Sequence, residues 1–482
     1  MTISVADVHF RYTFGTNGEL TEHGLSDITF SAEAGTLTVL CGASGSGKTT
    51  GLRLLNGLVP NFHPGTLTGT VTVADTDVPN QPLHDALLTS ATVFQNPRTQ
   101  FFTDEVTSEL AFGNENLGIP AEDTIARIRA AAKETATEHL IGRKLNELSG
   151  GQTQRVACAA AIASQAPVLL FDEPSSNLSP DAIADLHDIL AHQKDAGRTI
   201  VVAEHRLYFL RDLADQVLYF RDGRLAHRFT GEEFFALSDA QRRELGLRRI
   251  TPPEGTHPPA PPKGSAGLQL NNIRFSYLSK QILDIPEASF PAGAITALTG
   301  PNGCGKTTLA RLLCGLSSPA RGGTISINGT PMRSAARTKA SYIVMQDVSR
   351  QLFAEAVEDE ITLGHTASER EAIDVSTLLA QLDLDGLEDR HPQSLSGGQR
   401  QRLVIASAMA QNKQVHILDE PTSGVGQAHL VAIAERMRQL ADAGAVVIVI
   451  THDEELIEEC ADYVVHLPDI NRKTDACDTA RY

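Results

Sequence analysis

Five short strings of this 482-residue chain occur twice, in the same order. The first copy reads GASGSGKTT, VFQNP, LSGGQTQR, VLLFDEP and VVAEHR, and the second reads GPNGCGKTT, VMQDV, LSGGQRQR, VHILDEP and VIVITHD. Lys48 and Lys306 of the first string are 258 positions apart, and the last three strings repeat at a spacing of 247. A nearly constant spacing indicates a duplicated structural unit. The chain is therefore predicted to contain one domain twice.

A proline-rich segment separates the two copies. Residues 251–267 read TPPEGTHPPAPPKGSAG and include six prolines. Such a composition does not form a packed core, and it behaves as a semi-rigid spacer that spans about 50 Å when fully extended. We expect domains at residues 1–250 and 268–468, and a loose polar tail at residues 469–482.

Apolar runs of strand length alternate with amphipathic segments in both copies. Buried parallel strands are indicated by TLTVLCG, PVLLFDEP and TIVVAEH in the first copy and by AITALTG, QVHILDEP and AVVIVITHD in the second. GLRLLNGL and LARLLCGL follow the glycine-rich strings and show helical spacing of their apolar residues. Strands that alternate with helices predict, in each copy, an α/β domain with a mainly parallel sheet.

Composition argues against several classes of function. The 59 acidic and 41 basic residues give a formal charge of −18. We therefore expect no broad basic surface that binds nucleic acid. The six cysteines form no C-x-x-C pair, which favours reduced thiols over a disulfide framework. The N-terminus lacks a signal-peptide pattern, and no apolar run reaches the ~18 residues that cross a bilayer. If the protein serves a membrane, we expect other chains to cross it.

The two glycine-rich strings are candidate phosphate-binding loops. In a G-x-x-x-x-G-K-T loop between a strand and a helix, backbone amides and the positive helix end face an anion. The lysine, Lys48 or Lys306, contacts the β- and γ-phosphates, and the threonine, Thr49 or Thr307, offers a hydroxyl to Mg²⁺. The predicted ATP contacts in the loops are Gly42, Ser44, Gly45, Ser46, Gly47, Lys48, Thr49 and Thr50, and Gly300, Asn302, Gly303, Cys304, Gly305, Lys306, Thr307 and Thr308.

A pair of carboxylates ends a buried strand in each copy, within VLLFDEP and VHILDEP. Asp172 and Asp419 are predicted to hold Mg²⁺, directly or through water. Glu173 and Glu420 would orient and polarise the attacking water, because phosphoryl transfer depends on positioning and charge neutralisation. A strand-end Asp-Glu pair can also be a helix N-cap beside a solvated charge, but the glycine-rich loops favour the catalytic interpretation.

A histidine and a glutamine follow other strands of each copy. His205 and His452 each lie 32 positions after the glutamate of the acidic pair, which favours a γ-phosphate contact over a purely structural role. Gln95 and Gln346 are predicted to reach Mg²⁺ and the attacking water. The predicted metal ligands are Thr49, Gln95 and Asp172 in the first copy, and Thr307, Gln346 and Asp419 in the second.

The string LSGGQ precedes a long helical segment in both copies. A serine and two glycines at a helix N-terminus make a second anion site, for which one domain with one γ-phosphate has no evident use. The residues are Ser149, Gly150, Gly151 and Gln152, and Ser396, Gly397, Gly398 and Gln399. The five strings resemble the phosphate loop, glutamine loop, signature, carboxylate pair and histidine switch of the ATP-binding cassette family over nearly the full chain.

The resemblance implies an ATPase with two tandem P-loop nucleotide-binding domains. Each domain would have a mainly parallel core sheet, an antiparallel subdomain and a helical subdomain. In that family two domains pack head to tail, so Ser396 would close over ATP at Lys48 and Ser149 over ATP at Lys306. One loop alone would be useless, because each pocket needs half from each copy. Tethering makes the closure intramolecular, with an effective concentration on the order of mM.

Two aromatic residues and two loop positions complete the comparison with that family. Tyr12 and Tyr277 match its adenine-stacking position, with a surface strand tyrosine as the alternative interpretation. Ser179 and Gly426 stand where the family usually has an aspartate after the carboxylate pair. This departure concerns communication between the two pockets more than hydrolysis itself.

The segments VFQNPRTQFF and VMQDVSRQLF resemble the ATPases of energy-coupling-factor importers. The resemblance implies that this segment grips the coupling helices of an integral-membrane subunit; the alternative is ordinary core of the helical subdomain. A small substrate-binding membrane subunit and a peripheral place on the cytoplasmic face of the cell membrane are also implied. The implied docking residues are Gln100, Phe101, Phe102, Gln351, Leu352 and Phe353.

We therefore expect the ATP- and Mg²⁺-dependent motor of an importer of a vitamin, a vitamin precursor such as a thiamine-pathway compound, or cobalt or nickel. A fused sugar-importer ATPase is one alternative. The second pocket of that class is typically degenerate, whereas both phosphate loops and both carboxylate pairs are intact in this chain. A soluble twin-cassette ATPase acting on ribosomes is another, although that branch usually has a long charged linker and basic surfaces. An exporter partner is the remaining alternative.

Overall fold

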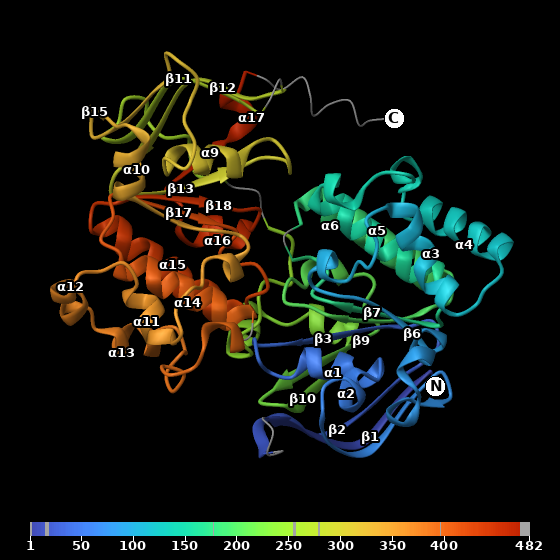
Figure 1. Ribbon diagram of the computed structural model, residues 1–482. Coiled ribbons are helices and arrows are strands. Elements are labelled where there is room, and N and C mark those ends of the chain that lie inside the picture. The colour runs from blue at the N-terminus through green and yellow to red at the C-terminus, as the bar shows by residue number, and fades with distance from the viewer. Residues whose placement is uncertain are drawn as a thin grey trace. The chain divides into compact units, whose positions relative to one another are not determined.

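The computed structural model describes residues 2–14, 19–176, 178–253, 257–277, 280–395 and 397–472. The chain divides into two compact units, Met1–Pro252 and Pro253–Tyr482 (Figure 1). Each unit contains a mainly parallel sheet, an antiparallel sheet and a group of helices, which confirms the predicted fold class. The duplicated sequence therefore folds as two α/β domains.

A mainly parallel sheet forms the core of the first unit. Its strands are β3 (Leu37–Gly42), β6 (Ser90–Val93), β7 (Val168–Asp172), β8 (Thr199–Ala203), β9 (Gln216–Arg221) and β10 (Arg224–Thr230). The order is β10-β9-β3-β8-β7-β6, and only β10 pairs antiparallel with its neighbour. Every residue of β3 and β8 is buried, as expected of continuous apolar runs covered on both faces. The glycine loop and the acidic pair therefore emerge at the same edge of this sheet.

An antiparallel sheet covers the helix that follows the first glycine loop. Its strands are β1 (Ile3–Phe14), β2 (Glu19–Ala32), β4 (Gly65–Val73) and β5 (Thr76–Asp77), in the order β2-β1-β4-β5. Helix α1 (Lys48–Leu55) contacts β7 and β8 on one side and β2 and β4 on the other. Leu52 and Leu55 of this helix join Phe10, Leu40 and Phe220 in one buried cluster. This packing fixes the helix whose N-terminus ends the loop.

Three of the remaining helices of the first unit form a helical subdomain. The remaining helices are α2 (Leu58–Asn61), α3 (Val106–Asn116), α4 (Ala121–Glu134), α5 (Gly150–Ala163), α6 (Pro180–Asp195), α7 (Gly231–Phe235) and α8 (Asp239–Glu244). Helices α3, α4 and α5 pack together (Figure 1) around a buried cluster that contains Val106, Leu110, Ile128 and Val156. The LSGGQ string therefore opens a helix of this subdomain.

The second unit repeats the two sheets. The parallel sheet has the order β16-β17-β18-β13-β19, and the antiparallel sheet has the order β12-β11-β14-β15. Their strands are β11 (Gly267–Tyr277), β12 (Lys280–Pro291), β13 (Ala294–Thr299), β14 (Thr324–Ile327), β15 (Thr330–Pro331), β16 (Ser341–Val344), β17 (Val415–Asp419), β18 (Val446–Ile450) and β19 (Tyr463–His466). The order of the five strands of this parallel sheet matches β9-β3-β8-β7-β6 of the first unit, so the same strand ends are brought together.

The helices of the second unit differ mainly in the helical subdomain. They are α9 (Lys306–Leu313), α10 (Ser334–Ala340), α11 (Val357–Thr362), α12 (Ala367–Ala372), α13 (Val375–Ala380), α14 (Gly397–Ala410), α15 (Gln427–Asp442), α16 (Glu454–Cys460) and α17 (Leu467–Ile470). Helix α11 has 6 residues, whereas α3 at the corresponding place in the first unit has 11. The signature helix keeps its length, since α5 and α14 both have 14 residues.

The predicted spacer and tail are partly held by the second unit. Within residues 251–267, the Pro259 carbonyl accepts a hydrogen bond from the Val464 amide, and the Gly264 amide donates to Oγ of Ser289. At the other end, Asn471 is buried, and its Oδ1 accepts from the Asp284 amide at 2.8 Å. Packing against the second unit therefore begins before residue 268 and continues beyond residue 468, because these segments find backbone partners there. Residues 473–482 of the predicted tail lie outside the described residues.

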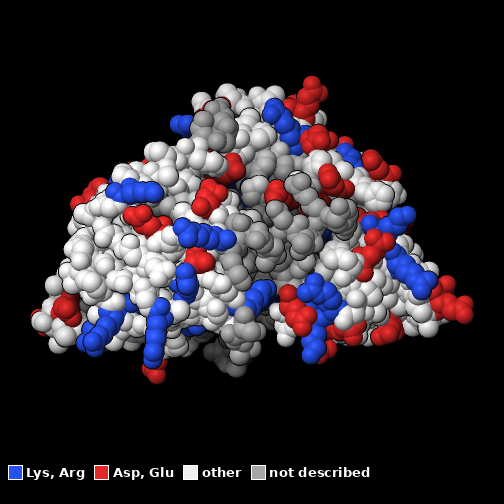
Figure 2. Space-filling model, turned by 90° about the horizontal axis from the view of Figure 1, so that it is seen from above, with Lys and Arg blue, Asp and Glu red and all other residues white. Residues whose placement is uncertain are grey.

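The surface carries charges of both signs. On the face shown in Figure 2, acidic and basic side chains are interspersed, and no broad basic area is visible. In the part of the chain that the structure describes, every helix is too short or too polar to cross a membrane.

Candidate active sites

The first glycine loop is a backbone cradle between β3 and α1. Gly42, Gly45 and Gly47 have φ angles of 141°, 78° and 107°, a region that glycine adopts without strain. A Cβ atom at Gly42 would lie 2.2 Å from the carbonyl oxygen of Phe220, so a side chain there has no room. The second loop has the same form, with φ angles of 139°, 84° and 109° at Gly300, Gly303 and Gly305. Both loops thus have the conformation that their sequences predict.

The lysine of each loop is buried and held in place. Nζ of Lys48 donates to the carbonyls of Gly42 and Ala43 at 3.0 and 2.9 Å and lies 3.2 Å from Nε2 of His205. Burial lowers the pKa of Lys48, and the nearby carboxylate of Glu173 opposes that shift. In the second unit, Nζ of Lys306 lies 2.6 Å from the carbonyl oxygen of the first loop glycine and 3.0 Å from Nε2 of His452. Each predicted histidine therefore lies beside its loop lysine, and the γ-phosphate contact stays a prediction for both.

Two serine hydroxyls of the first loop fit a bound phosphate. Oγ of Ser44 and Oγ of Ser46 are buried and have no hydrogen-bond partner among the described residues. A buried hydroxyl without a partner is costly, and phosphate oxygens are strong acceptors that would satisfy it. At the corresponding places of the second loop stand Asn302, whose Oδ1 lies 3.2 Å from Nε2 of His452, and Cys304. The two cradles are therefore similar in backbone and different in side chains.

Two of the three predicted metal ligands, the threonine and the aspartate, meet in each unit. Oγ1 of Thr49 donates to Oδ1 of Asp172 at 3.0 Å, and Oγ1 of Thr307 donates to Oδ2 of Asp419 at 2.9 Å. Burial raises the pKa of both aspartates, and the threonine hydrogen bonds oppose the shift. Hydroxyl and carboxylate oxygens suit Mg²⁺, which is usually held by one or two protein groups together with phosphates and water. Among the described residues, no group of three or more His, Cys, Asp or Glu side chains is placed to hold a metal ion.

The first predicted catalytic glutamate is surrounded by the residues expected to act with it. Nε2 of Gln95 donates to Oε2 of Glu173 at 2.8 Å, and Nε2 of His205 lies 3.5 Å from Oε1. Burial raises the pKa of Glu173 to about 8; Lys48 opposes this shift, and Asp172 adds to it. Glu173 has a φ of 46°, in the left-handed region that is costly for a residue with a side chain. A hydrogen bond from its amide to the Ala203 carbonyl, at 2.8 Å, holds that conformation.

The second catalytic glutamate has the same backbone and different neighbours. Glu420 has a φ of 51°, and its amide donates to the Ile450 carbonyl at 2.8 Å. Its Oε2 accepts a hydrogen bond from Oγ1 of Thr451 at 3.3 Å, a contact that sequence reasoning missed. Gln346, predicted to act beside it, is exposed after the end of β16. The position before the switch histidine is thus part of the second site, although no motif marks it.

The signature residues lie at helix starts. Ser149 is the N-cap of α5, where its amide donates to Oε1 of Gln152 at 3.0 Å and its Oγ accepts from the Gln152 amide at 3.4 Å. Gly150 and Gly151 form the first turn of this helix. Gly397, Gly398 and Gln399 open α14 in the same way, whereas Ser396 lies outside the described residues.

The two tyrosines predicted to stack on adenine occupy unlike environments. The hydroxyl of Tyr12 lies 3.0 Å from Oγ1 of Thr50, and its ring packs edge-on against Phe10. Tyr277 is 47 % exposed and packs edge-on against Phe275. Tyr12 is thus tied to the helix that follows its loop, while Tyr277 is the more accessible ring. Adenine stacking stays a prediction for both.

Comparison with known families decides what this pair of domains is. The family described as ABC transporter matches residues 25–176 and 283–423, together more than half of the chain. The chain belongs to the ABC transporter ATPase family. Each matched range contains one glycine loop, one LSGGQ string and one acidic pair, so the chain holds two ATP-binding cassettes. The predicted enzyme class, an ATPase, is confirmed.

Relatives of this ABC ATPase extend over almost its full length. A "Putative ABC transporter ATP-binding protein" of Treponema denticola is 38% identical and aligns with 96% of this chain and 95% of its own length. The "Putative HMP/thiamine import ATP-binding protein YkoD" of Bacillus subtilis is 29% identical, with 92% and 86% covered. Among solved structures, the "Model of ribosome-bound archaeal Pelota and ABCE1" has a chain with a TM-score of 0.68, 22% identity, and 95% and 76% covered. The last similarity shows the fold alone.

The two positions where the ABC ATPase departs from its family lie at helix starts. Ser179 precedes α6, and Gly426 precedes α15, each as the N-cap residue. Neither makes a side-chain capping hydrogen bond. A carboxylate at these positions would add a negative charge to a helix N-terminus, and this protein lacks that charge in both units.

The six residues predicted to dock a membrane subunit divide into supporting and exposed side chains. Oε1 of Gln100 accepts from the Phe94 amide at 3.0 Å, and Oε1 of Gln351 accepts from the Met345 amide at 2.6 Å. Leu352 is buried, and Phe101 packs against the core of its own unit. The other two side chains, Phe102 and Phe353, are each 77 % exposed.

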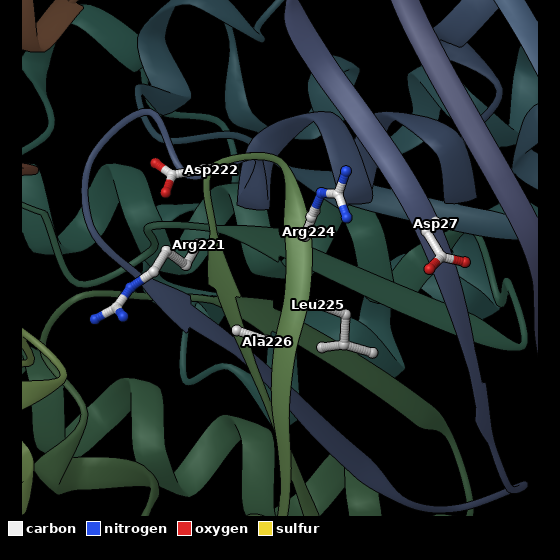
Figure 3. Close-up of a pocket in the computed structure, with 6 residues that line it drawn as sticks. All are labelled: Asp27, Arg221, Asp222, Arg224, Leu225 and Ala226. Atoms are coloured by element: carbon white, nitrogen blue, oxygen red, sulfur yellow. The ribbon is translucent and has the colours of Figure 1, made fainter.

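A pocket of the ABC ATPase lies apart from the residues that the motifs predict. It has a volume of about 410 Å³ and opens beside the β9–β10 hairpin (Figure 3); its lining residues are Asp27, Arg221, Asp222, Arg224, Leu225 and Ala226. The hairpin turn nevertheless supports the phosphate loop, because the Gly223 amide donates to the Ser46 carbonyl at 3.0 Å. The charges around the pocket are balanced, so it offers no preference for an anionic ligand. Its hairpin is better explained as a brace for the loop.

Proposed function

We propose that this ABC ATPase is the motor of an energy-coupling-factor importer, bound peripherally to the cytoplasmic face of a cell membrane. One observation carries the proposal: each unit presents a phenylalanine, Phe102 or Phe353, that is 77 % exposed in the segment after its glutamine loop. Single exposed apolar side chains are common on protein surfaces, but these two protrude at matched positions of the two units, which favours a shared contact role. A transporter with two coupling helices would place one helix on each unit.

Buried glutamates fix the backbone that presents the two phenylalanines. Oε2 of Glu109 accepts from the amides of Phe102 and Thr103, both at 3.0 Å. Oε2 of Glu360 accepts from the amides of Phe353 and Ala354, both at 2.8 Å. An anchor held in place before binding loses less conformational entropy on binding, so these contacts favour a docking role.

A chain of contacts links the docking segment to the catalytic carboxylate in the first unit. Gln100 holds the Phe94 amide, next to Gln95, and Gln95 donates to Glu173 at 2.8 Å. Displacement of the segment that carries Phe102 would therefore move the group that orients Glu173. This is the coupling that a transport motor needs between its membrane partner and its ATP site.

The chemistry assigned to each site is ATP hydrolysis by a positioned water. Lys48 and His205 would bind the γ-phosphate, while Gln95 and Glu173 orient the water and Glu173 accepts its proton. Bound Mg²⁺, held by Thr49 and Asp172, would neutralise charge on the phosphates. The second site uses the residues at matching positions. The family arrangement supports composite sites, in which the LSGGQ serine of one half closes over the ATP of the other.

The nature of the cargo is supported by a relative. The Bacillus subtilis relative is named for import of HMP and thiamine and aligns with 92% of this chain. We therefore propose a vitamin or vitamin precursor as cargo, with a transition-metal ion as the second choice. Membrane subunits that bind and pass this cargo would be the partners.

Two other functions are less well supported. A fused sugar-importer ATPase typically has a degenerate second pocket, whereas here the Thr307–Asp419 pair matches Thr49–Asp172. A ribosome-acting ATPase shares the fold, but that likeness carries no function at 22% identity. The formal charge of −18 also disfavours RNA binding, and on the face shown in Figure 2 charges of both signs are interspersed.

The test is to remove the two exposed rings and follow both binding and uptake. Tagged wild-type protein, the Phe102→Ser/Phe353→Ser variant and a Phe62→Ser control are each expressed in the source cells; Phe62 is 66 % exposed and lies outside the docking segment. Wild type and control should co-purify from detergent-solubilised membranes with the same integral-membrane subunits and support uptake of labelled thiamine precursor. The double variant should lose both while its ATPase rate in isolation stays within about twofold. Unchanged co-purification and uptake would refute the docking proposal.

A further inference from the structure

The residue before the switch histidine differs between the two units: it is Glu204 in the first and Thr451 in the second. The side chain of Glu204 is buried, with 2 % of the residue exposed. Its Oε1 accepts from the amides of His205 and Arg206 at 2.7 and 3.0 Å, and its Oε2 accepts from the amide of Ser175 at 3.1 Å. A buried carboxylate with three backbone donors is strongly held.

These three hydrogen bonds connect two turns that meet at the first ATP site. Ser175 stands two residues after Glu173, in the turn that follows the acidic pair, and it is buried. His205 begins the other turn and lies 3.2 Å from Nζ of Lys48. The carboxylate of Glu204 therefore fixes the backbone on both sides of the contact between Glu173 and His205.

The second unit connects the same two turns with different groups. At the spacing of 247 residues, Thr422 corresponds to Ser175 and Asp453 to Arg206. Oγ1 of Thr422 donates to Oδ2 of Asp453 at 2.6 Å, and the Asp453 amide donates to Oγ1 of Thr451 at 3.0 Å. The bridging carboxylate has thus moved to the far side of the histidine. The vacated position holds Thr451, whose hydroxyl donates to Glu420 itself at 3.3 Å.

We propose that Glu204 is a positioning residue of the first site, which holds the turn after Glu173 against the turn of His205. The inference rests on the roles proposed above for Glu173 and His205. It also predicts that the two sites are unequal by construction. In the first site the carboxylate of Glu204 bonds three backbone amides, and in the second a hydroxyl of the bridge donates to the catalytic carboxylate.

The first part of the test replaces the carboxylate with its closest neutral analogue. In Glu204→Gln, one acceptor oxygen becomes an NH₂ group that faces an amide donor, so one of the two turns loses its bond. We expect kcat for ATP hydrolysis by the purified full chain to fall between about 10- and 100-fold, as small misplacements of catalytic groups do. The KM for ATP should stay within about twofold. Glu204→Asp, which shortens the bridge and keeps both acceptors, should fall between Glu204→Gln and wild type.

The second part of the test transplants the bridge of the second unit. The triple variant Ser175→Thr/Glu204→Thr/Arg206→Asp carries the groups found at residues 422, 451 and 453. It should recover most of the kcat that Glu204→Thr alone loses, which a general loss of stability would not allow. Rates are measured both in the wild-type chain and in a Glu420→Gln background. In the Glu420→Gln background the remaining rate comes from the first site if the two sites hydrolyse ATP independently. The wild-type background gives the rate when the two sites depend on each other.

Two results would overturn the inference. One is a kcat that Glu204→Gln leaves unchanged in both backgrounds, relative to the same background with Glu204 intact. The other is a triple variant no faster than Glu204→Thr while both retain wild-type nucleotide binding and melting temperature. Glu173→Gln is assayed alongside as a control for the proposed catalytic role of Glu173. If Glu173→Gln hydrolyses ATP normally, that catalytic role is refuted, and an unchanged rate in Glu204→Gln is attributed to its failure and not to the bridge.

Discussion

Oγ1 of Thr49 donates a 3.0 Å hydrogen bond to Oδ1 of Asp172, across 123 positions of sequence. The contact exists because β8 lies between β3 and β7, so that the loop after β3 and the acid at the end of β7 open at one edge of the sheet. Thr307 and Asp419 repeat it at 2.9 Å in the second unit. The duplicated strand order therefore assembles a matching hydroxyl–carboxylate pair twice.

Removal of the threonine hydroxyl should change the need for Mg²⁺. In Thr49→Val/Thr307→Val, each aspartate loses the hydroxyl that orients it, and the metal loses a ligand. We expect the Mg²⁺ concentration for half-maximal ATPase rate to rise about tenfold or more. The matched control is Thr76→Val, whose hydroxyl bonds the Ala74 carbonyl at 3.4 Å. An unchanged Mg²⁺ titration in the double variant would show that the threonines do not serve the metal.

Neutralising the catalytic glutamates should separate ATP binding from ATP hydrolysis. Glu173→Gln/Glu420→Gln keeps the shape of both side chains and removes the base, for which a loss of about 10²–10⁴-fold in kcat is typical. Binding of a fluorescent ATP analogue should persist, and cargo uptake should stop. Glu358→Gln, on the exposed side of α11, is the control. Normal uptake by the double variant would contradict the mechanism.

The parts of each site that lie in the repeated strings could be predicted from the sequence. The reason is physical: a phosphate loop takes glycine at the positive φ angles of Gly42 and Gly47, and the proposed metal ligand Asp172 stands at a strand end, so residue type reveals position. Glu204 could not be found in this way. Its partners are backbone amides, which can belong to any residue type and leave no signal in the sequence. Its counterpart in the second copy is Thr451, which is not an acid, so comparison of the two copies does not single out Glu204.

The glutamates behind the exposed phenylalanines are an intermediate case. Glu109 and Glu360 stand seven positions after Phe102 and Phe353, so the two copies do carry a matching signal. What the sequence lacks is the direction of the side chain. An acid near the start of a helix normally faces solvent, and only the fold shows that each is buried beneath the docking segment.

Glu109 should be important for stability as well as for docking. Glu109→Ala leaves the amides of Phe102 and Thr103 without their acceptor, while the hydroxyl of Thr103 keeps the Glu105 carbonyl. We expect the free energy of unfolding to fall by about 1–3 kcal/mol, measured from urea midpoints at constant m-value. Glu115→Ala on the same helix is the control; its side chain is exposed, and it should change stability by less than about 0.5 kcal/mol. Equal midpoints for the two variants would mean that the Glu109 contacts are not formed.

A buried histidine away from the reacting groups should make stability depend on pH. His416 lies in β17 and is 1 % exposed, and burial lowers its pKa from 6.5 to about 4. Between those values the unfolded chain binds a proton that the folded chain excludes, so stability rises with pH. The contribution of neutral His416 to the free energy of unfolding is complete above pH 6.5 and is lost as the pH falls toward 4. The loss is at most about 1.4 kcal/mol for each pH unit.

Replacing His416 by an apolar residue should remove this dependence. We expect the urea midpoint of His416→Leu to fall less than that of wild type between pH 7 and pH 4.5, because no proton is taken up at this site on unfolding. His84→Leu is the matched control; the side chain of His84 is 82% exposed, so its loss should leave the pH dependence of wild type unchanged. Parallel curves for wild type and His416→Leu would show that His416 binds a proton equally well in the folded and unfolded protein, against the burial that the structure gives it.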